Sequence, residues 1–169
     1  MKKYPFLVFP FFFLCVIFSN SVLAQEGIKR HKIALFAPLH LDSAFTPSGT
    51  YRFSKNDFPN FLNPGLEFYE GVKIALDSFA AKNKPIEMFV YDTRSKKITL
   101  EKQLSLKELD SVELIIAYCS SSEVRIFANA GLKKNVPVIN VNLPNEGGTK
   151  NNPFFVLLNP TLRTQCEGI

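Results

Sequence analysis

Residues 32–39 read Lys-Ile-Ala-Leu-Phe-Ala-Pro-Leu, an almost unbroken apolar run that ends with a proline and a leucine. A run of this length predicts a β-strand that is buried on both faces, because a strand with one wet face would alternate apolar and polar residues. Strands of that kind belong to parallel sheets that are covered by helices. The stretch therefore predicts an α/β fold.

Further apolar runs follow and alternate with helical patterns. Strands are predicted at residues 86–92, 112–118, 136–141 and 154–158, and helices at residues 65–81, 98–109 and from residue 120 onward, with another after residue 161. Ser120 and Glu123 have the spacing of a capping box, which marks a helix start. This order predicts a three-layer α-β-α domain with a parallel sheet, of the Rossmann or flavodoxin-like kind.

The connection at residues 42–62, here called the aromatic loop, interrupts this pattern. It is rich in turn residues and also holds Phe45, Tyr51, Phe53, Phe58 and Phe61. A loop of this length inside a domain is usually functional or disordered. Because its aromatic side chains offer apolar area to bury, we expect an ordered loop that packs over one end of the sheet.

Residues 1–24 have the order of a secretory signal peptide. Lys2 and Lys3 come first, an apolar run at residues 6–18 follows, and small residues lead to a predicted cleavage after Ala24. The alternative is a retained membrane anchor, but the run is shorter than the roughly 20 residues that span a bilayer. We expect an exported domain at residues 25–169, located in the periplasm or outside the cell.

Composition and motifs narrow the function classes. Removal of the two leader lysines lowers the net charge from +5 to +3, and the basic residues are scattered, which argues against nucleic-acid binding. The two histidines and the absence of a Cys-x-x-Cys pair argue against a metal site. The chain has no glycine-rich phosphate loop and no Gly-x-Ser-x-Gly motif. We therefore expect a protein that is not an enzyme and needs no cofactor.

In an open parallel sheet, ligands bind outside the carboxyl ends of the strands. The candidate ligand-binding residues at these positions are Leu39, His40, Ser120, Ser121, Ser122, Asn140 and Asn142. The serine run is the most informative, since it lies where the free backbone N–H groups of a helix start favour a carboxylate. Simple capping by Ser120 explains the same pattern. Turn formation likewise explains the two asparagines, and an ordinary loop position explains His40.

Two further positions at strand ends have alternative roles. Asp92 follows the second predicted strand and fits a helix cap or a turn. Cys119 follows the third, but a nucleophilic role would require a neighbouring base, and the chain has few histidines to supply one. The pattern also leaves open whether Cys119 and Cys166 form a disulfide.

Four segments together resemble the amino-terminal lobe of type I periplasmic binding proteins, the leucine-binding or branched-chain amino acid receptor family of ABC transporters. These are the strand and turn at residues 33–39, the helix at residues 65–77, the serine turn at residues 118–122 and the helix-to-strand link at residues 135–139. The likeness extends over residues 33–163. It departs from the family in its longer aromatic loop and in Asn140 and Asn142, where the family has small residues.

The resemblance implies a bilobed protein that closes on a small polar ligand, often an amino acid, and delivers it to an ABC transporter permease. It implies that Ser120 and Ser121 contact the ligand's carboxylate and that the segment with Asn140 and Asn142 also lines the site. Residues 25–169 correspond to one lobe, so we expect the second lobe to be missing. Contact with a membrane is expected only through the permease. The alternative is an envelope sensory or protein-interaction module with the same fold, which the aromatic loop favours.

Overall fold

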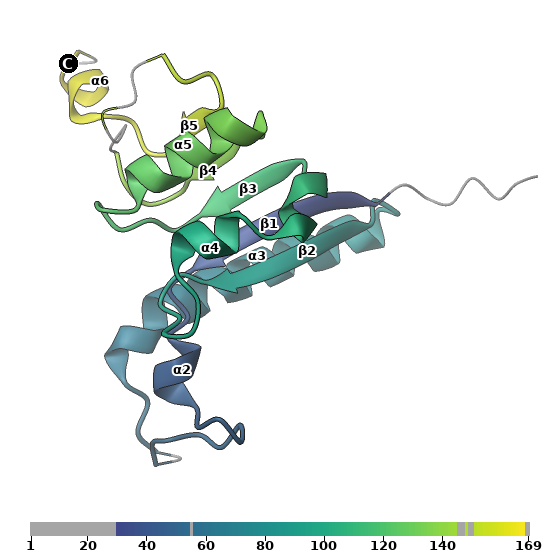
Figure 1. Ribbon diagram of the computed structural model, residues 1–169, viewed down its shortest axis with the longest axis vertical. Helices are drawn as coiled ribbons and strands as arrows, with labels where there is room; N and C mark the ends of the chain where they lie inside the picture. The colour runs from purple at the N-terminus through teal and green to yellow at the C-terminus, as the bar shows by residue number, and fades with distance from the viewer. Residues whose placement is uncertain (1–29, 55, 145–147, 149–150, 168–169) are drawn as a thin grey trace, which may run out of the picture.

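A five-stranded sheet forms the middle layer of this computed structural model, with all strands parallel in the order β2-β1-β3-β4-β5 (Figure 1). The strands are β1 (His31–Ala37), β2 (Ile86–Asp92), β3 (Leu114–Ala117), β4 (Val138–Asn140) and β5 (Phe155–Leu157). The structure describes residues 30–54, 56–144, 148 and 151–167, with only the backbone for residues 162 and 163. The predicted leader at residues 1–24 lies outside the described residues. The parallel pairing confirms the predicted α/β fold class.

Helices cover both faces of the sheet, as the alternation of strands and helices predicts. α3 (Asn63–Ala81) packs against β1 and β2 on one face. α4 (Leu100–Leu104), the 3₁₀ helix η3 (Lys107–Ser111) and α5 (Val124–Lys134) cover the other face (Figure 1). Three shorter elements are α2 (Leu41–Ala44), the 3₁₀ helix η2 (Asn60–Leu62) and α6 (Leu162–Glu167).

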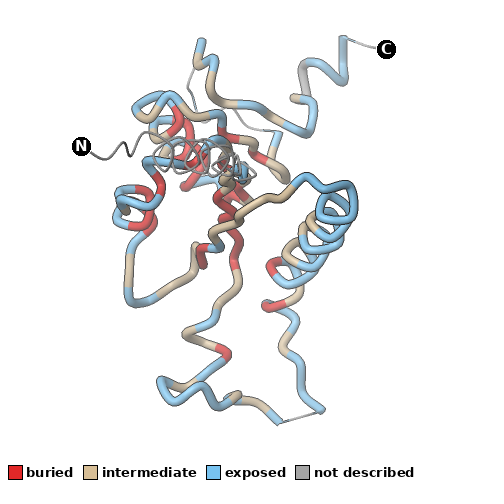
Figure 2. The backbone as a smooth tube through the Cα atoms, turned by 90° about the vertical axis from the view of Figure 1, so that its right-hand side faces the viewer, coloured by how far each residue is buried: buried red, intermediate tan, exposed pale blue. Residues whose placement is uncertain are grey.

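The buried core lies between the sheet and the layer of α4, η3 and α5 (Figure 2). Phe36 of β1 is at its centre, stacked on Tyr91 at 4.7 Å between ring centroids and edge-on to Phe127 at 5.2 Å. The opposite face is more open. Val156 of β5 points to the same face as α3 and stays 46% exposed, because α3 packs against the β1 and β2 side of the sheet.

The predicted helix at residues 98–109 is broken into α4 and η3. Leu106, between them, has an extended backbone, and the Ser105 hydroxyl donates to the carbonyl oxygen of Lys102 at the end of α4. In one continuous helix, Leu104 and Leu109 would point in directions about 140° apart. The break allows both side chains to reach the core, where both are buried.

The aromatic loop is ordered, but it does not pack over the sheet as expected. Figure 1 shows it projecting from the carboxyl ends of β1 and β2, with residue 55 outside the described part. Its rings pack on one another instead. Ring contacts link Phe45 to Tyr51, Tyr51 to Phe53, Phe53 to Phe61 and Phe61 to His40. The rings therefore form a small cluster within the loop, although Phe45, Phe58 and Phe61 remain partly exposed.

Candidate functional site

The residues predicted to bind a ligand lie at the carboxyl edge of the sheet, at the ends of three neighbouring strands. Leu39 and His40 follow β1, the serine turn Ser120–Ser122 follows β3, and Asn140 and Asn142 end and follow β4. Side chains join the turns after β3 and β4 directly, and Asp92 and Arg94 link the β1 segment and the serine turn to the end of β2. The structure thus brings together the segments that the strand order predicted, while individual side chains within them have different roles.

Asn142 fastens the turn after β4 to the turn after β3. Its side-chain oxygen accepts a hydrogen bond from the backbone N–H of Cys119, and its side-chain nitrogen donates to the carbonyl oxygen of Cys119, both at 2.8 Å. This pair of bonds replaces the ladder bonds that a longer strand would form. Asn142 therefore positions the serine turn and uses its amide group within the chain.

Asn140 is also engaged within the chain. It is fully buried, and its side-chain nitrogen donates to the carbonyl oxygen of Leu143 at 2.9 Å. Its side-chain oxygen accepts from the backbone N–H groups of Asn142 and Leu143 at 3.4 and 3.2 Å. A buried amide without partners would be costly, and these bonds remove that cost. Asn140 holds the turn after β4 in shape.

The serine turn precedes α5 and forms one of the two hydrogen bonds of the predicted capping box. The carboxylate of Glu123 accepts from the backbone N–H of Ser120 at 2.7 Å. The Ser120 hydroxyl, however, pairs with that of Ser122 at 3.1 Å. Glu123 is buried, and it is neutralised by Arg94, whose two terminal nitrogens each lie 3.2 Å from a different carboxylate oxygen. This fork-shaped pair fixes the turn to the loop after β2.

Hydrogen-bonding groups of the serine turn remain free for a ligand. Ser121 and Ser122 are exposed, and within the described residues their backbone N–H groups have no acceptor. Both lie in the turn before α5, where the helix dipole favours negative charge. Together with the hydroxyl groups, these N–H groups form a polar donor surface at the edge of the sheet.

Asp92 organises the β1 side of the same edge. Its carboxylate accepts hydrogen bonds from the backbone N–H groups of Leu39, His40 and Leu41 at 2.8–3.0 Å, and from Arg94 at 2.8 Å. The sequence suggested a cap or turn role for Asp92, and the structure shows it capping α2 from about fifty residues away. This interaction holds His40 in the left-handed conformation, with φ of 55°.

His40 lies in this fixed backbone with its ring edge-on to Phe61, at 5.1 Å between centroids. Partial burial lowers the pKa of His40, and the nearby positive charges of Arg94 and Lys96 lower it further, against the opposing effect of Asp92. The imidazole is therefore neutral at pH 7 and can donate one hydrogen bond and accept another.

Asp42 links the aromatic loop to the loop after β2. It forms an ion pair with Lys97 at 3.0 Å and accepts from the backbone N–H of Lys96 and from the Ser95 hydroxyl. These interactions, with the Lys97 bond first, hold the pKa of Asp42 below its usual value. Beside them is a small cleft of about 330 Å³ lined by Leu41, Asp42, Phe45, Thr46, Pro47, Arg52, Lys96 and Lys97.

The environment of Cys119 keeps its side chain in the protonated thiol form. It is 2% exposed, and burial, with a smaller effect of Glu123, raises its pKa to about 12. Thiolates are the nucleophilic form, and they are favoured by positive, accessible surroundings. Cys119 and Cys166 are both free, so the two do not form the disulfide that the sequence left open.

In the described part of the chain, no group of three or more His, Cys, Asp or Glu residues is placed to hold a metal ion. Its helices include none that is long and apolar enough to cross a bilayer. Comparison with protein-family models, with curated proteins and with solved structures gave no match.

Sequence reasoning located the segments of this edge but missed its framework. Arg94 had no role assigned to it, and Glu123 was expected only as part of a capping box. An indication for Arg94 was present, because it lies two residues beyond the end of β2 and so at the same edge as the serine turn. Its pairing with Glu123, 29 residues away, required the tertiary structure.

Proposed function

We propose that this chain is an exported solute-binding protein of an ABC-type transporter, and that it holds a small polar ligand with a carboxylate group, such as an amino acid. The ligand binds at the carboxyl edge of the sheet, with its carboxylate on the serine turn. The observation that carries this proposal is the pair of unsatisfied backbone N–H groups at Ser121 and Ser122, beside exposed hydroxyl groups. The resemblance to the type I binding-protein lobe supports the same assignment.

The framework around the serine turn suits this role. The bonds from Asn142 to Cys119 and from Glu123 to Ser120 hold the turn in one conformation before a ligand arrives. A preorganised site loses less conformational entropy on binding, so more of the interaction energy appears as affinity. The buried Glu123 does not repel a carboxylate strongly, because Arg94 neutralises it.

We expect Ser120 to contribute less to ligand binding than the resemblance implies. Its N–H group already donates to Glu123, so the donors available to a ligand are those of Ser121 and Ser122. We expect Leu39 and His40 to contact the rest of the ligand from the end of β1. Because Asn140 and Asn142 use their side chains within the chain, the proposal does not depend on them.

Isothermal titration with a panel of amino acids tests the proposal. We expect at least one to bind, and the double variant Ser121→Ala/Ser122→Ala to bind it about tenfold more weakly or worse, as loss of charge-assisted hydrogen bonds predicts. Ser78→Ala is the matched control, since the Ser78 hydroxyl bonds within α3 to Ile74. Equal affinity in the double variant and the control would refute a contact between the ligand and the two hydroxyl groups. Because alanine keeps the backbone N–H groups, failure of every amino acid to bind is the result that would refute the carboxylate site at the serine turn.

A second candidate function is protein interaction through the aromatic loop. The loop projects from the sheet, and the side chains of Phe45, Phe58 and Phe61 are 40–49% exposed. Exposed aromatic residues beside an arginine, here Arg52, are typical of protein interfaces. Affinity purification with the chain and with Phe58→Ser/Phe61→Ser discriminates: a partner held by the first and lost by the second supports this function if amino-acid binding is unchanged.

A further inference from the structure

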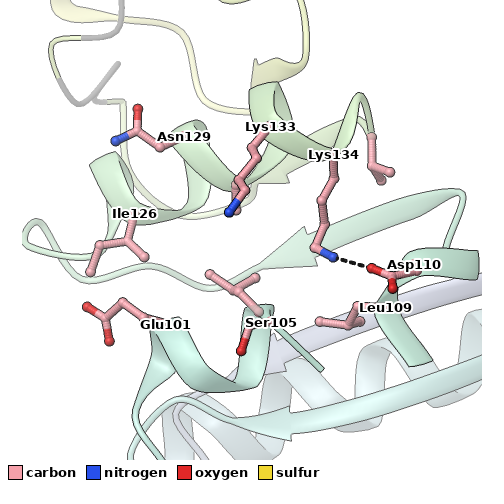
Figure 3. Close-up of a pocket in the computed structure, with 11 residues that line it drawn as sticks. Glu101, Ser105, Leu109, Asp110, Ile126, Asn129, Lys133 and Lys134 are labelled. Atoms are coloured by element: carbon pink, nitrogen blue, oxygen red, sulfur yellow. Dashed lines mark hydrogen bonds and ion pairs between the residues drawn. The ribbon is translucent and has the colours of Figure 1, made fainter. Parts of the chain in front are cut away.

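A cleft of about 590 Å³ lies between α5 on one side and α4 with η3 on the other (Figure 3). It lies on the helical face of the domain, and neither the serine turn nor the other candidate residues at the strand ends line it. Its volume is within the usual range for small-molecule sites, about 300–1,000 Å³. Neither the proposed solute binding nor the aromatic loop accounts for it.

The inner lining of the cleft is apolar. It is formed by Leu104, Leu109, Ile126, Ala130 and Val136. Leu104 and Leu109 belong to the buried core, and the other three pack against it. The lining is therefore continuous with the core of the domain and offers a surface for a hydrocarbon group.

Of the two lysines that line the cleft, one is paired within the chain and the other is available to a ligand. Lys134 forms an ion pair with Asp110 at 2.7 Å, which joins α5 to η3 at one end of the cleft. Lys133 directs its amine into the cleft in Figure 3 and has no acceptor among the described residues. Glu101 lies at the end opposite to the Lys134–Asp110 pair. The cleft thus combines one available positive charge, an apolar lining and one negative charge at its far end.

We propose that this cleft binds an apolar monocarboxylate, the chemical class of medium-chain fatty acids. The hydrocarbon chain lies on the apolar lining, and the carboxylate pairs with the ammonium group of Lys133. A charge-assisted bond of this kind, next to apolar surface, is among the stronger polar contacts in proteins. The Glu101 carboxylate repels a second acid group, so the cleft discriminates against dicarboxylates of the same length.

Decanoate, used below its micellar concentration, is the probe. We expect it to bind the chain with saturation in isothermal titration, and to shift the NMR signals of residues in α4, η3 and α5. We expect Lys133→Gln to weaken binding about tenfold or more. Lys84→Gln, an equal change of charge at an exposed lysine between α3 and β2, should leave it unchanged. Ala130→Phe, checked for folding by circular dichroism, should block the cleft.

Two analogues separate the parts of the proposal. Decanol has the same chain without the charge, and decanedioate has a second carboxylate, so both should bind more weakly than decanoate. The variant Ser121→Ala/Ser122→Ala should bind decanoate normally, which separates this cleft from the proposed solute site. Equal effects of Lys133→Gln and Lys84→Gln, equal binding of decanol, or signal shifts confined to other elements would each overturn the proposal. So would self-association of the chain that occludes the cleft and prevents decanoate binding.

Discussion

Gly65, at the start of α3, lies directly against Pro38, at the end of β1. A Cβ atom at position 65 would be 2.2 Å from the carbonyl oxygen of Pro38 and 2.7 Å from its carbonyl carbon. Both neighbouring atoms belong to the backbone, so no side chain can rotate away. This contact sets how closely α3 approaches the sheet, next to the segment that carries Leu39 and His40.

We therefore expect Gly65→Ala to destabilise the protein by roughly 1–3 kcal/mol, the cost of overpacking a tight contact. Gly71→Ala in the same helix is the matched control, because a Cβ there meets nothing within 4 Å. The control should stabilise the protein by up to about 1 kcal/mol, since alanine favours a helix over glycine. Urea unfolding measures both, and opposite signs are the expected result.

Asp92 gives a second prediction. Its carboxylate is the acceptor for four backbone N–H groups, those of Leu39, His40, Leu41 and Arg94. Asp92→Ala leaves them without an acceptor, and we expect a loss of roughly 2–4 kcal/mol in the free energy of unfolding. The exposed Asp77 on α3, changed to alanine, should have an effect within about 0.5 kcal/mol. Similar losses in both variants would contradict the role given to Asp92.

The two cysteines of the described chain should differ strongly in reactivity. Because Cys119 is buried with its pKa raised to about 12, it should resist a thiol reagent such as DTNB at pH 8, whereas the exposed Cys166 should react readily. Denaturant should make both react. Native protein of the Cys166→Ser variant should then show almost no fast reaction, and a fast phase in that variant would disprove the burial of Cys119.

Asp42 predicts a specific dependence of stability on pH. Lys97, Lys96 and Ser95 lower the pKa of Asp42 in the folded protein. The contribution of Asp42 to the free energy of unfolding is therefore complete at pH values above the pKa that Asp42 has in the unfolded chain. That contribution is lost as the pH falls through the lower folded value. The difference in unfolding free energy between the protein and Asp42→Asn should therefore be largest near neutral pH and shrink in acid. A difference that stays constant from pH 7 to pH 3 would contradict this.

The leader gives a prediction outside the described residues. If residues 1–24 are a signal peptide, amino-terminal sequencing of the exported protein should begin at Gln25. Replacing Ala24 with a bulky residue such as Tyr should slow the cleavage, because the peptidase requires small side chains before the cut. Recovery of full-length chain from the membrane fraction would instead support the alternative of a retained anchor.

Much of the fold was predictable from local patterns. The strand at residues 86–92 was located to the residue, and the helix expected at residues 65–81 begins two residues earlier. β3 and β4 are shorter than their apolar runs, because Val112 and Val136 begin those runs without pairing in the sheet. The split of the helix expected at residues 98–109 was missed, since it follows from the position of the core relative to Leu104 and Leu109.

For the site, the sequence located the segments but left the roles of their side chains open. An asparagine after a strand fits a turn or a ligand contact equally well. Asn142 holds a turn because its amide group bonds to the backbone of Cys119. Asn140 also holds a turn, because it is buried and its amide group bonds to the backbone of Leu143. The prediction that the aromatic loop packs over the sheet was wrong for a similar reason. Its rings contact one another, and no spacing of residues in the sequence indicates such contacts.

The sequence alone determined the class of fold, because burial on both faces of a strand is visible in the composition of that strand. It also determined which segments meet at the carboxyl edge, since parallel strands end on the same side of a sheet. Only the tertiary structure decided which polar groups at the carboxyl edge form hydrogen bonds within the chain and which stay free. Asp92, Glu123 and Asn142 satisfy backbone groups of other segments, whereas the N–H groups of Ser121 and Ser122 remain unpaired among the described residues. Such pairing depends on distances of a few ångströms between residues far apart in the chain, and local sequence carries no record of them.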